Sequence, residues 1–196
     1  MTPRDVALWQ AAKPWLDVRS NDVHTLIAWR LAGTLLSLRP GVDEAVVRPA
    51  ILLHDTGWKK MPQEKLALAV GPNALFPELQ RDHEVAGVEI SRDILGRLGL
   101  ALNDAAILAL VDGHDTTKSA RSAEDAIVKD ADKLWRFTPH GVATIGGWFQ
   151  TPAPDTLAML EDFVLPSFLT PEARIMAQGF LAEGWASAER EERMQG

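Results

Sequence analysis

A chain of 196 residues, 46% hydrophobic and 24% charged, is long enough to bury a core and has the balance of a soluble globular protein. Its formal net charge of −7 argues against a broad surface for nucleic acid polymers, although it leaves room for a local basic pocket. Because cysteine is absent, thiolate catalysis, disulfides and cysteine metal sites are excluded, and a transition metal would need histidine, aspartate or glutamate ligands.

The ends and the hydropathy of the chain favour a cytoplasmic protein without a membrane partner. The first residues, MTPRDVALWQ, lack the basic-then-apolar pattern of a secretion signal. No apolar run reaches the about 18 residues that a membrane-spanning helix needs. The sequence leaves the oligomeric state open.

Helical periodicity begins at residue 20. Apolar residues recur at helical spacing over residues 20–38, and Ser20, Asn21 and Asp22 are the candidate N-caps. The next helix is predicted to open at Asp43, to kink or restart at Pro49, and to end at Gly57. Residues 59–80 hold three prolines and a glycine and are predicted to form a lid-like loop with one short helix.

Further helices are predicted over residues 81–100, 103–113 and 122–137, with Asn103 and Ser122 as caps. Residues 141–150 fit either a helix or a loop. Two helices cover residues 152–194, the last with Pro171 in its first turn. Since no segment alternates with period two, we predict an all-α fold. It would be a single-domain helical bundle spanning residues 1–196, with its core motifs at about 20–137 and the C-terminal helices packed on it.

Four of the five histidines lie on, or at the end of, apolar helical segments: His24, His54, His83 and His114. A buried imidazole without a partner costs about 1–3 kcal/mol, and one metal centre would satisfy several at once. Any one of them alone is more often a core residue with an ordinary hydrogen bond. His140, in the sequence FTPHG, stands apart and is interpreted as a structural or exposed residue in a turn.

In chain order the motifs are His24, the doublet His54-Asp55 in ILLHDTG, His83 in HEVAGVEI, His114, and Asp132 in IVKDADKLWRF. This ordered set on a helical chain resembles the HD-domain superfamily, named for its His-Asp doublet, over residues 20–137. ILLHDTG is similar to the family's ALLHDIG, and the segment around Asp132 is similar to its ADRL. The neighbouring Asp130 is expected to lie behind the ligand or to face solvent.

The resemblance implies a divalent transition metal (Mn, Fe, Ni, Co or Zn) held by His24, His54, Asp55 and Asp132. Members that also carry the two remaining histidines can hold two ions, because a bridging carboxylate offers two oxygens. The set here is His24, His54, Asp55, His83, His114 and Asp132. The sequence does not decide between one ion and two.

The commonest activity in the superfamily is phosphate ester hydrolysis, for which a metal activates water and neutralises phosphoryl charge. The resemblance therefore implies a metal-dependent phosphohydrolase acting on a small anionic phosphate ester, nucleotides included. Asp55 would orient the attacking water, and Lys133 would steady the phosphate. Lys59, Arg136 and Trp58 are further predicted substrate contacts. Lys59 fits a solvated loop position equally well, and Trp58 could stack on a base or anchor the loop that follows.

Two other functions stay open. A branch of the superfamily uses the same six ligands for a di-iron centre that activates oxygen on diols or phosphonates. One such branch uses a tyrosine near the metal, and this chain contains none. The other possible function is that of a non-catalytic, metal-stabilised sensor domain. The glutamate that some nucleotidases carry three residues after the doublet is replaced by Trp58.

Overall fold

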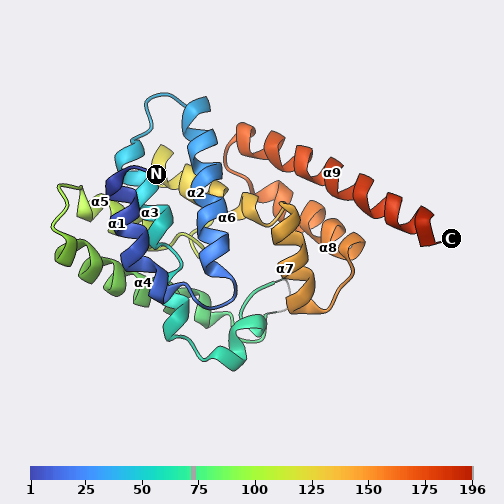
Figure 1. Cartoon of the computed structure of the whole chain (residues 1–196), viewed down its shortest axis with the longest axis horizontal. Helices are drawn as coiled ribbons and strands as arrows, with labels where there is room; N and C mark the ends of the chain where they lie inside the picture. The colour runs from blue at the N-terminus through green and yellow to red at the C-terminus, as the bar shows by residue number, and fades with distance from the viewer. Residues whose placement is uncertain (72–73, 196) are drawn as a thin grey trace.

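A computed structural model of the chain describes residues 1–71 and 74–195, and over these residues it contains helices and no strand (Figure 1). The prediction of an all-α fold is thus confirmed. No helix in the described ranges is long and apolar enough to span a bilayer. The α-helices are α1 (Pro3–Ala12), α2 (Asn21–Leu38), α3 (Glu44–Leu53), α4 (Glu78–Leu98), α5 (Asp104–Val111), α6 (Ala123–Trp135), α7 (Pro139–Phe149), α8 (Ala153–Met159) and α9 (Pro171–Gln195).

Most helix starts lie where the sequence predicts them. The side chains of Asp43, Asn103 and Ser122 each accept a hydrogen bond from a backbone N–H in the first turn of α3, α5 and α6. Ser20 precedes α2 without such a bond. Of the kink or restart predicted at Pro49, the restart is wrong, because α3 continues through this residue to Leu53.

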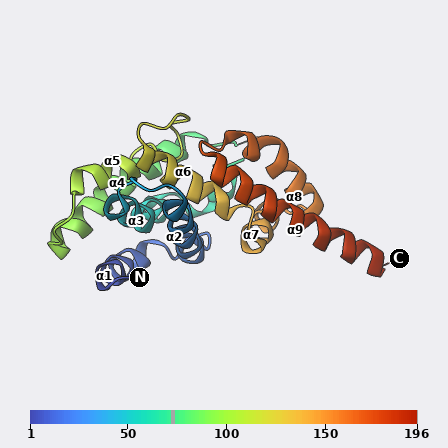
Figure 2. The same ribbon diagram turned by 90° about the horizontal axis from the view of Figure 1, so that it is seen from above.

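The helices α2 and α6 pack against each other at the centre of the molecule, and α3 packs against both (Figures 1 and 2). On its outer side α3 contacts α1 and α5, while α4 lies against α1 and α5. Burial of apolar side chains from these helices forms the main core and supplies most of its stabilisation. Fully buried examples are Leu35, Ile51, Leu53, Ile127 and Leu134.

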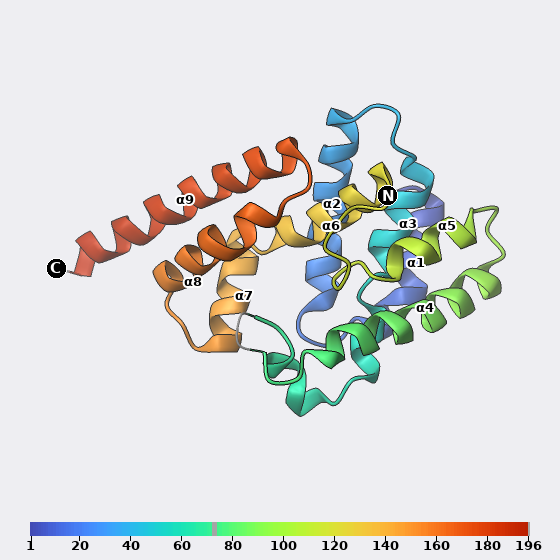
Figure 3. The ribbon, with the colours of Figure 1, turned by 180° about the vertical axis from the view of Figure 1, so that it is seen from behind.

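The C-terminal third of the chain forms the other end of the molecule. Here α8 packs against α7 and α9, and α9 also contacts α2 and α6 (Figure 3). The C-terminal part of α9 extends past the other helices (Figure 2). A single domain over residues 1–196 stays a prediction.

The lid-like segment, residues 59–80, contains two 3-10 turns, η2 (Thr56–Lys60) and η3 (Gln63–Leu68), instead of one short helix in a loop. A small second core anchors it, made by Val18, Trp58, Leu66, Ala69 and Leu79. Residues 72 and 73 of this segment, Pro72 among them, lie outside the described residues.

Gly57 brings the end of α3 against α4. A Cβ atom built on Gly57 would lie 1.8 Å from the carbonyl oxygen of His83 and 2.6 Å from the backbone nitrogen of Gly87. Any side chain here would force η2 away from α4. The glycine after the doublet therefore allows His54 and Asp55 to approach His83.

Candidate metal centre

The six predicted ligands come from five parts of the chain and meet in one buried place. His24 is on α2, the doublet His54-Asp55 ends α3, His83 is on α4, His114 follows α5 and Asp132 is on α6. All six side chains are buried. Within the described residues their ligand atoms fall into three overlapping groups, in which His54, Asp55 and His114 connect a group of His24, His54 and Asp132 to a group of His83, His114 and Asp115.

The first ligand group consists of His24, His54 and Asp132. The Nε2 atoms of His24 and His54 are 2.9 Å apart, and they lie 3.3 and 3.6 Å from Oδ1 of Asp132. Ligand atoms about 2.1 Å from one ion are separated by about 3.0–3.5 Å in tetrahedral or octahedral geometry. The spacing of this group therefore fits a single transition-metal ion.

The second ligand group consists of His83, His114 and Asp115. The Nε2 atoms of His83 and His114 are 3.3 Å apart, and Oδ2 of Asp115 lies 4.0 Å from His83 Nε2. Asp55 connects the two groups, because its Oδ2 is 3.3 Å from His24 Nε2 while its Oδ1 is 3.5 Å from His114 Nε2.

The orientation of three imidazoles supports a cation at this place. Nδ1 of His54 is 2.7 Å from the Ile51 carbonyl, and Nδ1 of His114 is 2.8 Å from the Val111 carbonyl. Nδ1 of His83 is 3.3 Å from the Leu79 carbonyl. A carbonyl only accepts, so each Nδ1 carries the proton. In a neutral ring the lone pair is then on Nε2. Here these lone pairs face one another and the carboxylate oxygens, and such groups repel each other unless a cation lies among them.

The pKa values of the buried side chains also indicate that this place favours a positive charge. Burial, helped by repulsion from His114, lowers the pKa of His83 to about 4. Burial also opposes a charge on His114, but Asp55 and Asp115 outweigh it and raise the pKa of His114 to about 10. The pKa of Asp55 lies well below its ordinary value, because the facing imidazoles outweigh its burial. A proton on His114 thus occupies part of the region that favours a cation.

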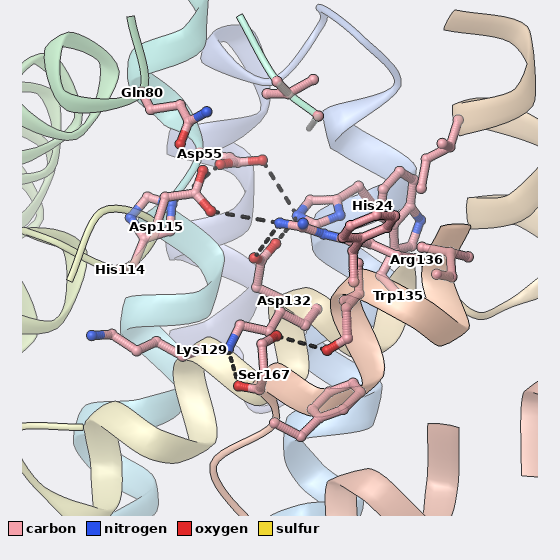
Figure 4. A pocket seen from close by; sticks show the side chains of 18 of the residues that line it. His24, Asp55, Gln80, His114, Asp115, Lys129, Asp132, Trp135, Arg136 and Ser167 are labelled. Carbon is pink, nitrogen blue, oxygen red and sulfur yellow. Dashed lines mark hydrogen bonds and ion pairs between the residues drawn. The ribbon is translucent and has the colours of Figure 1, made fainter. Parts of the chain in front are cut away.

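Five of these side chains line a cavity of about 650 Å³, namely His24, Asp55, His114, Asp115 and Asp132, whereas His54 and His83 lie behind them (Figure 4). Arg136 reaches across both groups: its Nη2 is 3.3 Å from Oδ2 of Asp132 and 3.5 Å from Oδ1 of Asp115. These carboxylates outweigh burial and raise the pKa of Arg136, so its guanidinium stays charged. Lys133 also lines the cavity, and its ammonium donates to the Ser167 carbonyl at 2.8 Å.

Two of the predicted substrate contacts, Lys59 and Trp58, are engaged by other side chains of the protein. Lys59 is not part of the cavity lining, and its Nζ lies 2.7 Å from Oδ1 of Asp17 in a surface ion pair. Trp58 does line the cavity, but its ring stacks on His83 with the centroids 3.9 Å apart, and the Arg19 guanidinium lies 4.4 Å over the ring. With both faces covered, Trp58 cannot stack on a base in this conformation.

Asp130 takes the first of the two places expected for it, behind the ligand, and His140 has a structural contact but lies in a helix. Asp130 does not face solvent: it is buried and accepts hydrogen bonds from the backbone of Leu169 and Thr170, so it fixes the start of α9 behind Asp132. His140 lies in the first turn of α7 rather than in a turn, and its Nδ1 accepts a hydrogen bond from Nε1 of Trp135 at 3.1 Å.

Sequence reasoning missed Asp115, Arg19 and Asn21, all of which line the cavity. Asp115 carries a readable signal, because His114-Asp115 repeats the His-Asp doublet. Arg19 and Asn21 lie in the polar stretch DVRSND, and no spacing sets them apart from an ordinary loop.

Histidines and carboxylates from separate helices converge around Asp55, which is the kind of side-chain set that holds divalent metals in helical domains. The sequence model of the HD domain family matches residues 22–136, more than half of the chain, and this span includes all six predicted ligands. The chain therefore belongs to the HD superfamily of metal-dependent phosphohydrolases. Comparison with curated proteins and with solved structures found no match.

Proposed function

We propose that this chain is a metal-dependent phosphohydrolase that acts on a small phosphate ester. The observation that carries the proposal is the pair of buried ligand groups connected by Asp55, which together contribute His24, Asp55, His114, Asp115 and Asp132 to the lining of a cavity of about 650 Å³. A cavity of this size suits a small organic ligand. Cationic side chains line the same cavity, so it suits an anionic substrate.

His24, His54 and Asp132 would hold one ion, and His83 and His114, with Asp115, would hold a second. Asp55 would touch both. When bound, such ions lower the pKa of water towards 7 and neutralise charge on phosphoryl oxygens. The mixed imidazole and carboxylate set suits Mn, Fe, Co, Ni or Zn.

Two cations would hold the phosphate. Arg136 contacts Asp132 and Asp115 through Nη2, so the N–H groups on Nη1 and Nε can bind phosphoryl oxygens. Lys133 donates one of its three N–H groups to the Ser167 carbonyl and keeps two for the substrate. These contacts would orient the phosphorus towards Asp55, whose carboxylate would align the attacking water.

The test combines metal analysis with turnover. The protein is stripped with a chelator, reloaded with each of the five metals, and assayed for phosphate release from phosphomonoesters and nucleotides. We expect release to depend on metal and to be lost in His54→Ala, with circular dichroism unchanged. Full turnover and metal content in His54→Ala would contradict the proposal.

The two joined ligand groups also favour one second candidate, a di-iron oxygenase acting on a diol or phosphonate. Two bound irons with oxygen uptake, and no phosphate release, would select it. A protein that holds metal without any turnover would be a metal-stabilised sensor domain.

A further inference from the structure

Two polar residues at the start of α2 line the cavity without partners for their donors. Within the described residues, Nε and Nη1 of Arg19 and Nδ2 of Asn21 are buried and have no hydrogen-bond partner. Buried polar groups in proteins are nearly always hydrogen-bonded, and an orphan donor is costly, most of all on a charged group. Because these residues line the cavity, their unpaired donors favour the binding of a ligand that carries a hydrogen-bond acceptor.

The Arg19 guanidinium is held in place by aromatic rings. Its Cζ lies 4.4 Å from the ring centroid of Trp58 and 4.4 Å from that of Trp148. Arg19 has a backbone φ of 55° and Ser20 one of 60°, in the left-handed region that costs a non-glycine residue about 1–2 kcal/mol. The chain thus adopts an unfavourable backbone that places the guanidinium against two indole rings, with Nε and Nη1 left without hydrogen-bond partners among the described residues.

The surroundings of Arg19 indicate what it binds. Burial lowers the pKa of Arg19, and the charges of Asp55, Asp115 and Asp132 oppose that effect. Arg19 lines the same cavity as the predicted ligands His24, Asp55 and Asp132, and among the described residues its Nε and Nη1 have no hydrogen-bond partner. An anion in this cavity would therefore lie between the predicted ligands and a cation that shares their wall.

Another part of the cavity wall is apolar. It is formed by Trp148 and Phe149 of α7, Met159 of α8, and Phe163 and Val164 of η4 (Leu160–Val164), a π-helical turn. Such turns are rare and are often found at functional sites. Phe163 is 64% exposed although it belongs to this wall. We call these five residues the apolar wall.

We propose that Arg19 and Asn21 bind the phosphate of the substrate while the apolar wall binds its organic group, so that the site selects phosphate monoesters of apolar alcohols. This inference rests on the proposed function and narrows its substrate class. Esters of glycerol or of sugars lack the surface that the apolar wall would cover, and they are disfavoured. Arg19 is a binding residue here, with no part in the bond cleavage.

The test measures binding with probes that cannot be hydrolysed. Hexylphosphonate and methylphosphonate share a head group and differ in five methylenes. Their Kd values are measured by titration calorimetry on metal-loaded protein without oxygen. Each buried methylene tightens binding by about fourfold, so burial of two or three predicts a hexyl preference of at least about tenfold. Equal affinities would overturn the inference.

Variants separate the two parts of the site. Arg19→Gln is expected to weaken both probes by about 10–100-fold with their ratio unchanged. Arg19→Lys, which keeps the charge and guards against a misfolded Gln variant, weakens both by less. Phe163→Ser is expected to lower the hexyl preference about threefold or more and to leave methylphosphonate binding unchanged. Its control is Ile175→Ser on α9, outside the cavity lining, where the residue is similarly exposed (67%) and neither Kd should change.

The outcomes for the two proposals differ. If hexylphosphonate is preferred but no phosphate is released from hexyl phosphate, the hydrolase function fails and the ligand class stands. If phosphate is released equally from hexyl and glycerol phosphate, and the two phosphonates bind equally, the hydrolase stands and the inference fails. Unchanged affinities in both Arg19 variants would remove the anion-binding role.

Discussion

Replacing Asp55 with Asn removes the one carboxylate that both ligand groups share and keeps the size of the side chain. Metal present at about 100 times its Kd stabilises the folded state by about 2.7 kcal/mol. For a chain of 196 residues, each kcal/mol raises Tm by about 2–4 °C. Metal should therefore raise the Tm of the natural protein by about 5–11 °C and that of Asp55→Asn by less than about 2 °C.

The assay is differential scanning calorimetry with and without Mn²⁺ after chelator treatment. The readout is the metal-induced shift, because the basal Tm also depends on how Asp55 interacts with the facing imidazoles. Asp93→Asn is the control, since it makes the same charge change at an exposed ion pair with Arg97 on α4. An Asp55→Asn variant with the full metal-induced shift would refute the assignment of Asp55 as a shared ligand.

Gly57→Ala should lower the free energy of unfolding in urea titrations by about 3 kcal/mol or more, because the new Cβ atom meets the backbone of α4. The control Gly96→Ala should be neutral or stabilising, because no atom lies within 4 Å of its Cβ position. Burial opposes the charge on Asp125, but its bonds to cationic partners hold its pKa below the ordinary value. The stability that the Asp125 carboxylate contributes is present above about pH 4 and is lost on further acidification. Between pH 6 and pH 3 the free energy of unfolding should therefore fall less in Asp125→Asn than in the natural protein. Lys59→Ala should leave kcat/KM within about twofold, whereas Arg136→Gln should lower it by about 10–100-fold in phosphate-release assays.

Each of these outcomes can fail on its own. A stable Gly57→Ala variant would mean that η2 can move away from α4. An unchanged acid limb in the Asp125 variant would remove that carboxylate as a source of acid sensitivity. Loss of activity in Lys59→Ala would restore Lys59 as a substrate contact.

Helix placement could be predicted from the sequence, because caps and apolar spacing are local signals. Asn103 and Ser122 act as the caps that their residue types suggest. Pro49 misled the prediction, since the tertiary packing of α3 maintains the helix through a residue that disfavours it. Of residues 141–150, which fit either state, all but the C-cap Gln150 are helical in α7, where Thr138 caps the first turn.

The candidate site was predictable only as far as its motifs extend. His24, the doublet and Asp132 are spaced in an order that a family pattern makes visible, and the structure brings them together. Arg19 could not be found in this way. Its position depends on Trp58 and Trp148, which come from distant parts of the chain and meet only in the folded protein.

Asp115 was overlooked for a different reason. It repeats the doublet pattern beside His114, but a carboxylate after a helix end is common in turns. Only its distance of 4.0 Å from the imidazole of His83 marks it as part of the second ligand group.

The most direct test of the metal centre is anomalous diffraction from crystals grown with Mn²⁺. We predict one anomalous peak among the side chains of the first ligand group and another among those of the second, with one oxygen of Asp55 next to each. Crystals that diffract well and show no anomalous peak near Asp55 would contradict the metal centre on which the proposed chemistry depends.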